Sequence, residues 1–171
     1  DSLKTIARKP DAAGVRMTLC IAGLTNDAFV DRDEYGAVVV RGALTDQALL
    51  VSAMKAGFDR QKLLEQYPQL DSLPFNSRDK LAATLHRYDR DTLLRSVVGA
   101  PETILEHAAG VHLHGSTTHL GSQEFLQLKE SIGKLSAEGY RVLACAYRYY
   151  PIDFQYPHLS ETVTKLIIAG Y

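Results

Sequence analysis

The sequence predicts an α+β fold with a largely antiparallel sheet flanked by helices. Residues 81–88 and 93–98 are two apolar runs separated by the polar turn "DRDT", the pattern of a β-hairpin. Apolar residues also recur at helical spacing in 45–57 and again in 125–135. Hairpins are thus mixed with helices, whereas a parallel sheet requires strict alternation of strand and helix.

In the first half of the chain, residues 15–24 have the apolar spacing of a helix. The polar stretch 26–36 is expected to be a loop that ends in a turn, and the β-branched run 37–41 a short strand. A helix is expected next, with Thr45 as its N-terminal cap and Gly57 at its end.

In the second half, a short helix is predicted over 61–66, and another begins at Pro101 and ends at Gly110. Gly139 is expected to end the helix whose apolar face carries Phe125, Leu128, Ile132 and Leu135. Strands are predicted over 140–150 and in the C-terminal run 166–171.

Length and charge limit the classes of protein that fit. The 171 residues are enough for one domain with a core, so we predict a single domain over 1–171. A net charge of −1 gives no footprint for nucleic acid, and no apolar run approaches the roughly 20 residues of a membrane span.

Cys20 and Cys145 lie in apolar surroundings, which favours a cytosolic compartment without a disulfide framework. Because the chain starts at Asp1 and stops on an apolar run, we expect a fragment of a larger protein.

Common catalytic and phosphate-binding motifs are missing from the sequence. It has no GxxxxGK[ST], GxGxxG, GxSxG or HExxH. His112, His114 and His119 could form a metal cluster or belong to a solvated loop. Their spacing differs from that of a closed zinc site, and no cysteine or nearby carboxylate accompanies them before Glu124. The solvated loop is therefore favoured, and no metal site is predicted.

Several segments, in order, resemble one protein family. They are "TNDAFVD" at 25–31, "GALTDQALLVSAMKAG" at 42–57, "LPFNSRDKLAATLHRY" at 73–88, "VGAPETIL" at 98–105 and "EGYRVLACAYR" at 138–148. Together they resemble the nucleotide-binding domain of cation-transporting P-type ATPases, in the subgroup of the calcium and sodium/potassium pumps. The agreement in order over nearly the whole chain is specific, although each segment alone is a weak signal.

The resemblance implies an ATP site. Phe75 matches the aromatic residue on which adenine stacks, Lys80 the lysine that faces the nucleotide, and Arg141 the arginine at the phosphates. Asp46 stands where the family has a glutamate that accepts from the adenine amino group. Gly99 and Ala100 match the residues of a turn that lets the nucleotide approach. Each of the four side chains also has an ordinary alternative role. These roles are a core aromatic for Phe75, a solvated lysine for Lys80, a charge at a helix start for Asp46 and a surface ion pair for Arg141.

The chain departs from the family pattern at several positions of this site. Val98 stands where the family has a pocket lysine. This replacement removes a charge-assisted hydrogen bond to the nucleotide of about 1–3 kcal/mol. The family's Asp-Pro pair is Ala43 and Leu44 here, a glycine is Gln47, and the methionine of the strand motif is Ala82.

Two functions follow from the resemblance and the departures. The first is an ATP-binding domain that delivers the γ-phosphate to an aspartate of a "DKTGT" motif, which this chain lacks. Such a domain binds ATP, with magnesium arriving alongside, but does not catalyse alone. Its partners are the phosphorylation and actuator domains of a membrane pump, and it lies on the cytoplasmic side. The alternative is the same fold, with weak or lost nucleotide affinity, serving as a regulatory or protein-interaction module.

Overall fold

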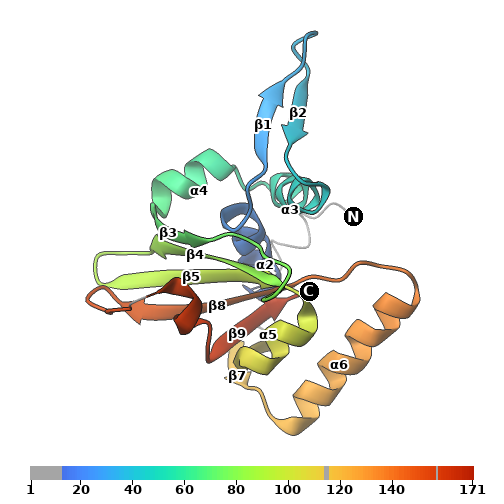
Figure 1. The fold of residues 1–171 in the computed structure, drawn as a ribbon, viewed down its shortest axis with the longest axis vertical. Coiled ribbons are helices and arrows are strands. Elements are labelled where there is room, and N and C mark those ends of the chain that lie inside the picture. The colour runs from blue at the N-terminus through green and yellow to red at the C-terminus, as the bar shows by residue number, and fades with distance from the viewer. Residues whose placement is uncertain (1–12, 114–115, 157) are drawn as a thin grey trace.

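The computed structural model describes residues 13–113, 116–156 and 158–171, and its centre is a mixed sheet of seven strands in the order β3-β4-β5-β8-β9-β6-β7 (Figure 1). Every neighbouring pair is antiparallel except β6 and β9. A separate two-stranded sheet, β1-β2, projects away from it (Figure 1). The predicted α+β class with a largely antiparallel sheet flanked by helices is confirmed.

The predicted hairpin forms the middle of the large sheet. It consists of β4 (Leu81–Arg87) and β5 (Thr92–Gly99), and β5 also pairs with β8 (Ala144–Pro151). All of β5 after Thr92 is buried, because both of its neighbours are strands and both sheet faces are covered by other elements. β5 therefore anchors the fold.

The outer strands show what the sequence pattern missed. The predicted C-terminal strand is confirmed as β9 (Leu166–Gly170), but it pairs in parallel with β6 (Ala108–Leu113). β7 (Ser116–His119) and β3 (Gln69–Leu73) lie at the two sheet edges, and neither was predicted. Both edge strands are short and largely exposed, so they lack an apolar pattern.

Helices cover the two faces of the large sheet (Figure 1). On one face α2 (Ala13–Leu24) packs on the sheet, and α3 (Leu44–Lys55) and α4 (Arg60–Gln66) pack against α2. On the other face lie α5 (Pro101–His107), α6 (Ser122–Ala137) and the short 3-10 helix η1 (Leu159–Thr162). Each face of the sheet has its own apolar core, and successive residues of β5 point into opposite ones. Val97 belongs to the core with Ile104 of α5, and Val98 to the core with Ile21 of α2. No helix of the described residues has the length and apolar character needed to cross a membrane.

Several predicted helix ends are confirmed. Gly57 and Gly139 follow α3 and α6 with φ of 95° and 87°, the left-handed backbone that glycine adopts without strain. Pro101 is the first residue of α5, as predicted. The predicted cap at Thr45 is wrong: the N-cap is Ala43, whose side chain cannot accept a hydrogen bond, and Thr45 lies in the first turn.

The predicted helix end at Gly110 is also wrong. α5 stops at His107, and Gly110 lies in β6, where it pairs with β9 and β7. Likewise the solvated loop predicted around the histidines is the β6-β7 hairpin, with His112 in β6 and His119 in β7. His114 lies outside the described residues. Both errors arose because β6 is formed by pairing with β9, far along the chain.

Two strand predictions need changed boundaries. The stretch 26–36 is not all loop, because β1 (Phe29–Arg32) pairs with β2 (Val38–Arg41), the strand predicted at 37–41. No residue of this hairpin's strands is buried and most are exposed, so β1 has no alternating apolar pattern to reveal it. The strand predicted over 140–150 starts at Ala144, and the residues before it form a loop.

A buried histidine makes the fold sensitive to acid. His86 of β4 is fully buried, its Nδ1 lies 2.9 Å from the carbonyl oxygen of Tyr67, and its Nε2 has no hydrogen-bond partner. Burial lowers the pKa of His86 and outweighs the opposing effect of the hydrogen bond to the Tyr67 carbonyl, and the positive charge of Arg60 adds a smaller decrease. The folded state therefore holds this imidazole neutral where the unfolded chain protonates it.

We expect the free energy of unfolding to fall as the pH drops below about 6.5, the ordinary pKa of histidine. In that range the unfolded chain takes up a proton that His86 in the folded chain does not. Urea unfolding between pH 7.5 and 5 measures the effect. His86→Gln should flatten the slope, whereas the exposed His119→Gln should keep it. An equal slope in both variants would contradict the assignment to His86.

Candidate functional site

A cavity of about 290 Å³ lies where the α2-β1 loop, α3 and one end of the β4-β5 hairpin meet. Its volume is close to the lower limit of about 300 Å³ for small-molecule sites. Eleven residues line it: Thr25, Ala43, Thr45, Asp46, Leu49, Phe75, Ala82, Val98, Gly99, Arg141 and Leu143. Of the seven site residues predicted from the sequence, the lining thus includes Asp46, Phe75, Val98, Gly99 and Arg141.

Asp46 is the carboxylate of this cavity. It lies half-buried in the first turn of α3, where the positive end of the helix favours a negative charge. Burial raises the pKa of Asp46 and the negative charge of Asp27 adds to the increase, while a hydrogen bond from the Asp27 backbone N–H opposes it. The carboxylate is held in place by that N–H and keeps lone pairs for a donor in the cavity.

Phe75 and Arg141 lie in loops that flank the cavity. Phe75 follows β3 and leaves 58% of its surface exposed, so it is not the core aromatic that was its alternative reading. Arg141 lies in the exposed loop between α6 and β8. The cavity thus combines an accessible aromatic ring and one cation with mostly apolar walls, a combination suited to a flat heterocycle that carries negative charge.

Val98 belongs to the apolar wall. It is 6% exposed, pairs with Ala82 on β4 and Cys145 on β8, and packs into the core cluster beneath α2. Its side chain therefore contributes to the core and to the cavity surface at once. Where the family pattern has an ammonium group, this chain presents two methyl groups.

Lys80 and Ala100 lie beside the cavity and not among its lining residues. The Ala100 N–H donates to the Lys80 carbonyl oxygen at 2.9 Å, which closes the end of the β4-β5 hairpin. Lys80 has a φ of 52°, and its exposed Nζ lies 3.6 Å from Oε1 of Glu102. The lysine is thus paired with the first turn of α5.

The reason for a glycine at position 99 differs from the one expected. A Cβ there would lie 2.7 Å from the Leu81 Cβ and 2.7 Å from the Lys80 carbonyl oxygen. The neighbouring strand, rather than space for a nucleotide, therefore excludes a side chain at Gly99.

Six of the eleven lining residues were not predicted as site residues: Thr25, Ala43, Thr45, Leu49, Ala82 and Leu143. The Thr25 hydroxyl forms a buried hydrogen bond of 2.8 Å with the hydroxyl of Thr84. All six lie within segments quoted for the resemblance, so their place in those segments was the available signal. Leu49 faces the cavity from α3, but its spacing is that of any core residue.

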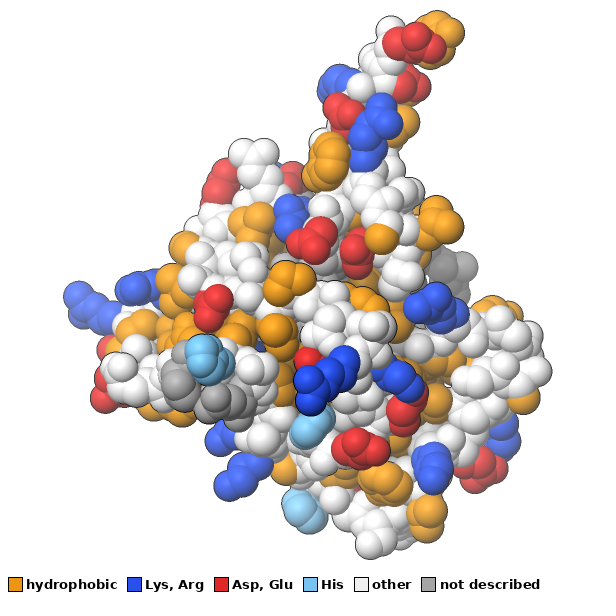
Figure 2. All heavy atoms as spheres, viewed as in Figure 1, with side chains coloured by type: hydrophobic (Ala, Val, Ile, Leu, Met, Phe, Trp, Pro, Cys, Tyr) orange, Lys and Arg blue, Asp and Glu red, His pale blue; other side chains and the backbone are white. Residues whose placement is uncertain are grey.

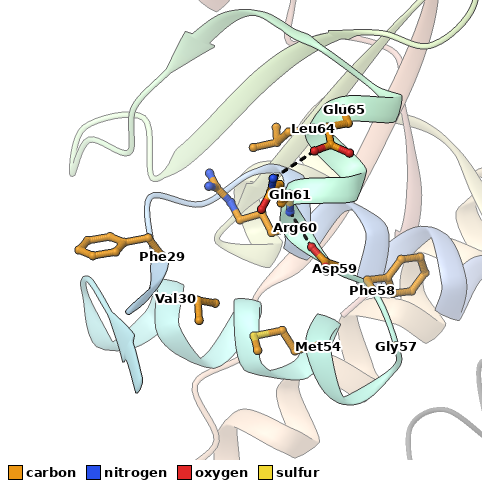
Figure 3. Close-up of a pocket in the computed structure, with 10 residues that line it drawn as sticks. All are labelled: Phe29, Val30, Met54, Gly57, Phe58, Asp59, Arg60, Gln61, Leu64 and Glu65. Atoms are coloured by element: carbon orange, nitrogen blue, oxygen red, sulfur yellow. Dashed lines mark hydrogen bonds between the residues drawn. The ribbon is translucent and has the colours of Figure 1, made fainter. Parts of the chain in front are cut away.

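A larger groove of about 810 Å³ lies elsewhere, between β1, the turn after α3, and α4 (Figure 3). None of the seven site residues predicted from the sequence lines it. In the part of the chain that the structure describes, no three histidine, cysteine or acidic side chains are grouped to hold a metal ion. The ring of His112 is instead hydrogen-bonded, with its Nε2 2.9 Å from the Tyr147 hydroxyl.

The fold and the cavity are those of an α+β domain with a cavity of small-molecule size beside its central hairpin. Comparison with known sequences identifies the family. Residues 14–171 match the family model described as "P-type ATPase, cytoplasmic domain N". The chain is 37% identical over 148 residues to cation-transporting ATPase pma1 of Synechocystis, which covers 86% of this chain and 16% of that protein.

Two further relatives are also named as cation-transporting ATPases. A calcium-transporting ATPase of Bacillus subtilis is 24% identical over 158 residues, covering 91% of this chain and 17% of the relative. The sodium/potassium-transporting ATPase subunit alpha-2 of Gallus gallus is 30% identical over 139 residues, covering 78% of this chain and 14% of that subunit. The chain belongs to the family of P-type ATPase cytoplasmic N domains, and it spans less than a fifth of the length of these relatives.

Proposed function

We propose that residues 1–171 form the ATP-binding domain of a cation-transporting P-type ATPase and that the cavity holds the adenine end of ATP. The observation that carries the proposal is the meeting of Phe75, Asp46 and Arg141 around one cavity, although they lie far apart in the sequence. Phe75 stacks on the adenine ring, Asp46 accepts from its amino group, and Arg141 faces the phosphates.

In this proposal the domain positions ATP and does not cleave it. The aspartate that receives the γ-phosphate lies on a phosphorylation domain of the parent pump, since "DKTGT" is absent from this sequence. Magnesium arrives with ATP. Phosphoryl transfer mainly requires alignment and charge stabilisation, which the closing of the phosphorylation and actuator domains supplies. The parent lies in a membrane with this domain on its cytoplasmic side.

Lys80 is proposed to exchange partners when ATP binds. Its ion pair with Glu102 is exposed on both sides, and such pairs contribute little free energy. The ammonium group can therefore turn from Glu102 toward a phosphate at small cost. Lys80 is therefore proposed to contact the nucleotide only once ATP is bound.

Replacing Phe75 with alanine should weaken ATP binding about 5- to 150-fold, which corresponds to a loss of about 1–3 kcal/mol of stacking. Isothermal titration calorimetry of the 171-residue chain measures the change. Thermal stability should be nearly unchanged, because more than half of the Phe75 surface is exposed. Tyr35→Ala is the matched control, since Tyr35 lies in the β1-β2 turn and is 86% exposed. Equal ATP affinity in both variants would argue against stacking on Phe75.

The alternative is a regulatory or protein-interaction module that has lost useful ATP affinity. The observation in its favour is Val98, which puts an apolar wall where a lysine is expected. An ATP titration followed by amide chemical shifts separates the two functions. Shifts at Phe75, Asp46, Gly99 and Arg141 support ATP binding, and no shifts at millimolar ATP would support the alternative.

A further inference from the structure

The projecting β1-β2 hairpin has an open edge beside the larger groove (Figures 1 and 3). The groove is lined by β1, by the turn after α3 and by α4, and no residue of β2 lines it. In the described sheets β1 has β2 as its one neighbour, so the other edge of β1 is unpaired there. An unpaired edge is a template for another strand.

The hydrogen-bond alternation identifies which backbone groups point outward. The Asp33 N–H donates to the Ala37 carbonyl oxygen at 3.0 Å, and bonded pairs in an antiparallel hairpin alternate from there. Val30 and Arg32 therefore direct their backbone groups away from β2. The Arg32 N–H is already bonded to the Asp31 carboxylate at 2.8 Å, so Val30 supplies the open donor.

Apolar side chains line the groove beside this edge. Val30 of β1 and Met54 of α3 point toward the same space, with Leu64 of α4 on the far wall (Figure 3). Val30 is 48% exposed, and Figure 2 shows apolar and charged side chains together along the projecting hairpin. The Arg60 Nη2 donates to the Asn26 carbonyl oxygen at 2.9 Å, which ties α4 to the chain just before β1. The groove walls are thus held in place without an occupant.

The charged groups of the groove favour a cationic occupant. Asp59 caps α4 by accepting from the backbone N–H groups of Gln61 and Lys62. Glu65 accepts a hydrogen bond of 3.1 Å from the Gln61 side chain. Neither carboxylate is in an ion pair among the described residues. With two carboxylates and one cation, Arg60, the lining of the groove carries one excess negative charge.

We propose that the β1 edge and this groove bind an extended segment of another protein by strand addition. The segment pairs with the backbone of Val30, inserts an apolar side chain between Val30, Met54 and Leu64, and places a lysine or arginine near Glu65. This interaction goes beyond the ATP-binding function and does not depend on it, since the groove and the cavity share no lining residue.

The test uses the 171-residue chain and an acetylated, amidated peptide of sequence KVTVTVK. Binding is followed by amide chemical shifts and by hydrogen exchange. We expect shifts along β1 and α4, with exchange at the Val30 N–H slowed at least tenfold, because that group gains a partner. The same peptide with its three central amide nitrogens methylated is the control, and it should bind at least tenfold more weakly.

Matched proline variants test the edge itself. Val30→Pro removes the outward donor of β1, whereas Val38→Pro removes an outward donor of β2, at a similarly exposed residue (57%). Val30→Pro should weaken peptide binding at least tenfold, and Val38→Pro should leave it within twofold. Glu65→Lys, which leaves the hairpin sequence unchanged, should weaken binding of this dibasic peptide at least threefold.

Each other result overturns the proposal. Equal binding of the methylated peptide would mean that backbone pairing is absent, and equal losses in both proline variants would mean that the β1 edge is not the site. Unchanged affinity in Glu65→Lys would remove the charge argument. Sedimentation of the chain alone is also measured: self-association that Val30→Pro abolishes would assign the edge to a second copy instead of a partner protein.

Discussion

Val98→Lys should bind ATP about ten to a hundred times more tightly than the original chain. Position 98 lines the proposed adenine cavity together with Asp46 and Arg141, and a lysine there adds a charge-assisted hydrogen bond. Such a bond contributes about 1.5–3 kcal/mol, or one to two factors of ten in the dissociation constant. Isothermal titration calorimetry with ATP measures it directly.

The same change should cost stability. Val98 is buried in the cluster formed with Leu94 and Cys145, and a lysine must keep its stem there while its ammonium group reaches the cavity. Val98→Met is the matched control, because it lengthens the side chain without adding charge and should not tighten ATP binding. A folded Val98→Lys domain with unchanged or weaker affinity would show that ATP does not occupy this cavity.

Gly99→Ala should destabilise the domain by about 1–3 kcal/mol. The added Cβ would lie 2.7 Å from the Leu81 Cβ and from the Lys80 carbonyl oxygen. Both neighbours belong to the central hairpin, and a backbone oxygen cannot swing aside as the end of a long side chain can. The strands β4 and β5 must therefore separate at the edge of the cavity, and urea unfolding measures the loss.

Gly133→Ala provides the matched control for that measurement. Gly133 lies in α6, and a Cβ there has no atom within 4 Å outside its own helix turn and chain neighbours. Alanine should stabilise that exposed helix by about 0.5–1 kcal/mol. If Gly99→Ala were as stable as Gly133→Ala, the close packing of the two strands at position 99 would be contradicted.

Local patterns were sufficient for most of the elements. The hairpin of β4 and β5, the helix start at Pro101 and the helix end at Gly139 all follow from a few neighbouring residues. These features are decided by apolar spacing, by the fixed φ of proline and by the freedom of glycine, which the sequence states directly. The order of the five quoted segments likewise pointed to the family that the comparison confirmed.

The errors fall where distant contacts decide the structure. Gly110 was expected to end a helix, but pairing with β9 makes its segment a strand. Arg95 lies in the middle of β5 and is fully buried, with its guanidinium carbon 5.0 Å from the centre of the Tyr150 ring. A charged residue at a strand centre is usually exposed, and only the strands and loop packed around it bury it here.

The sequence by itself determined the fold class, the central hairpin, most helix boundaries and the family, because each depends on local periodicity or on motifs in order. Only the tertiary structure decided that Phe75, Asp46 and Arg141 line one cavity, that Val98 is part of its wall, and that β1 borders a second groove. These relations join segments far apart in the chain. Their free energy comes from packing and strand pairing between those segments, which no local pattern records.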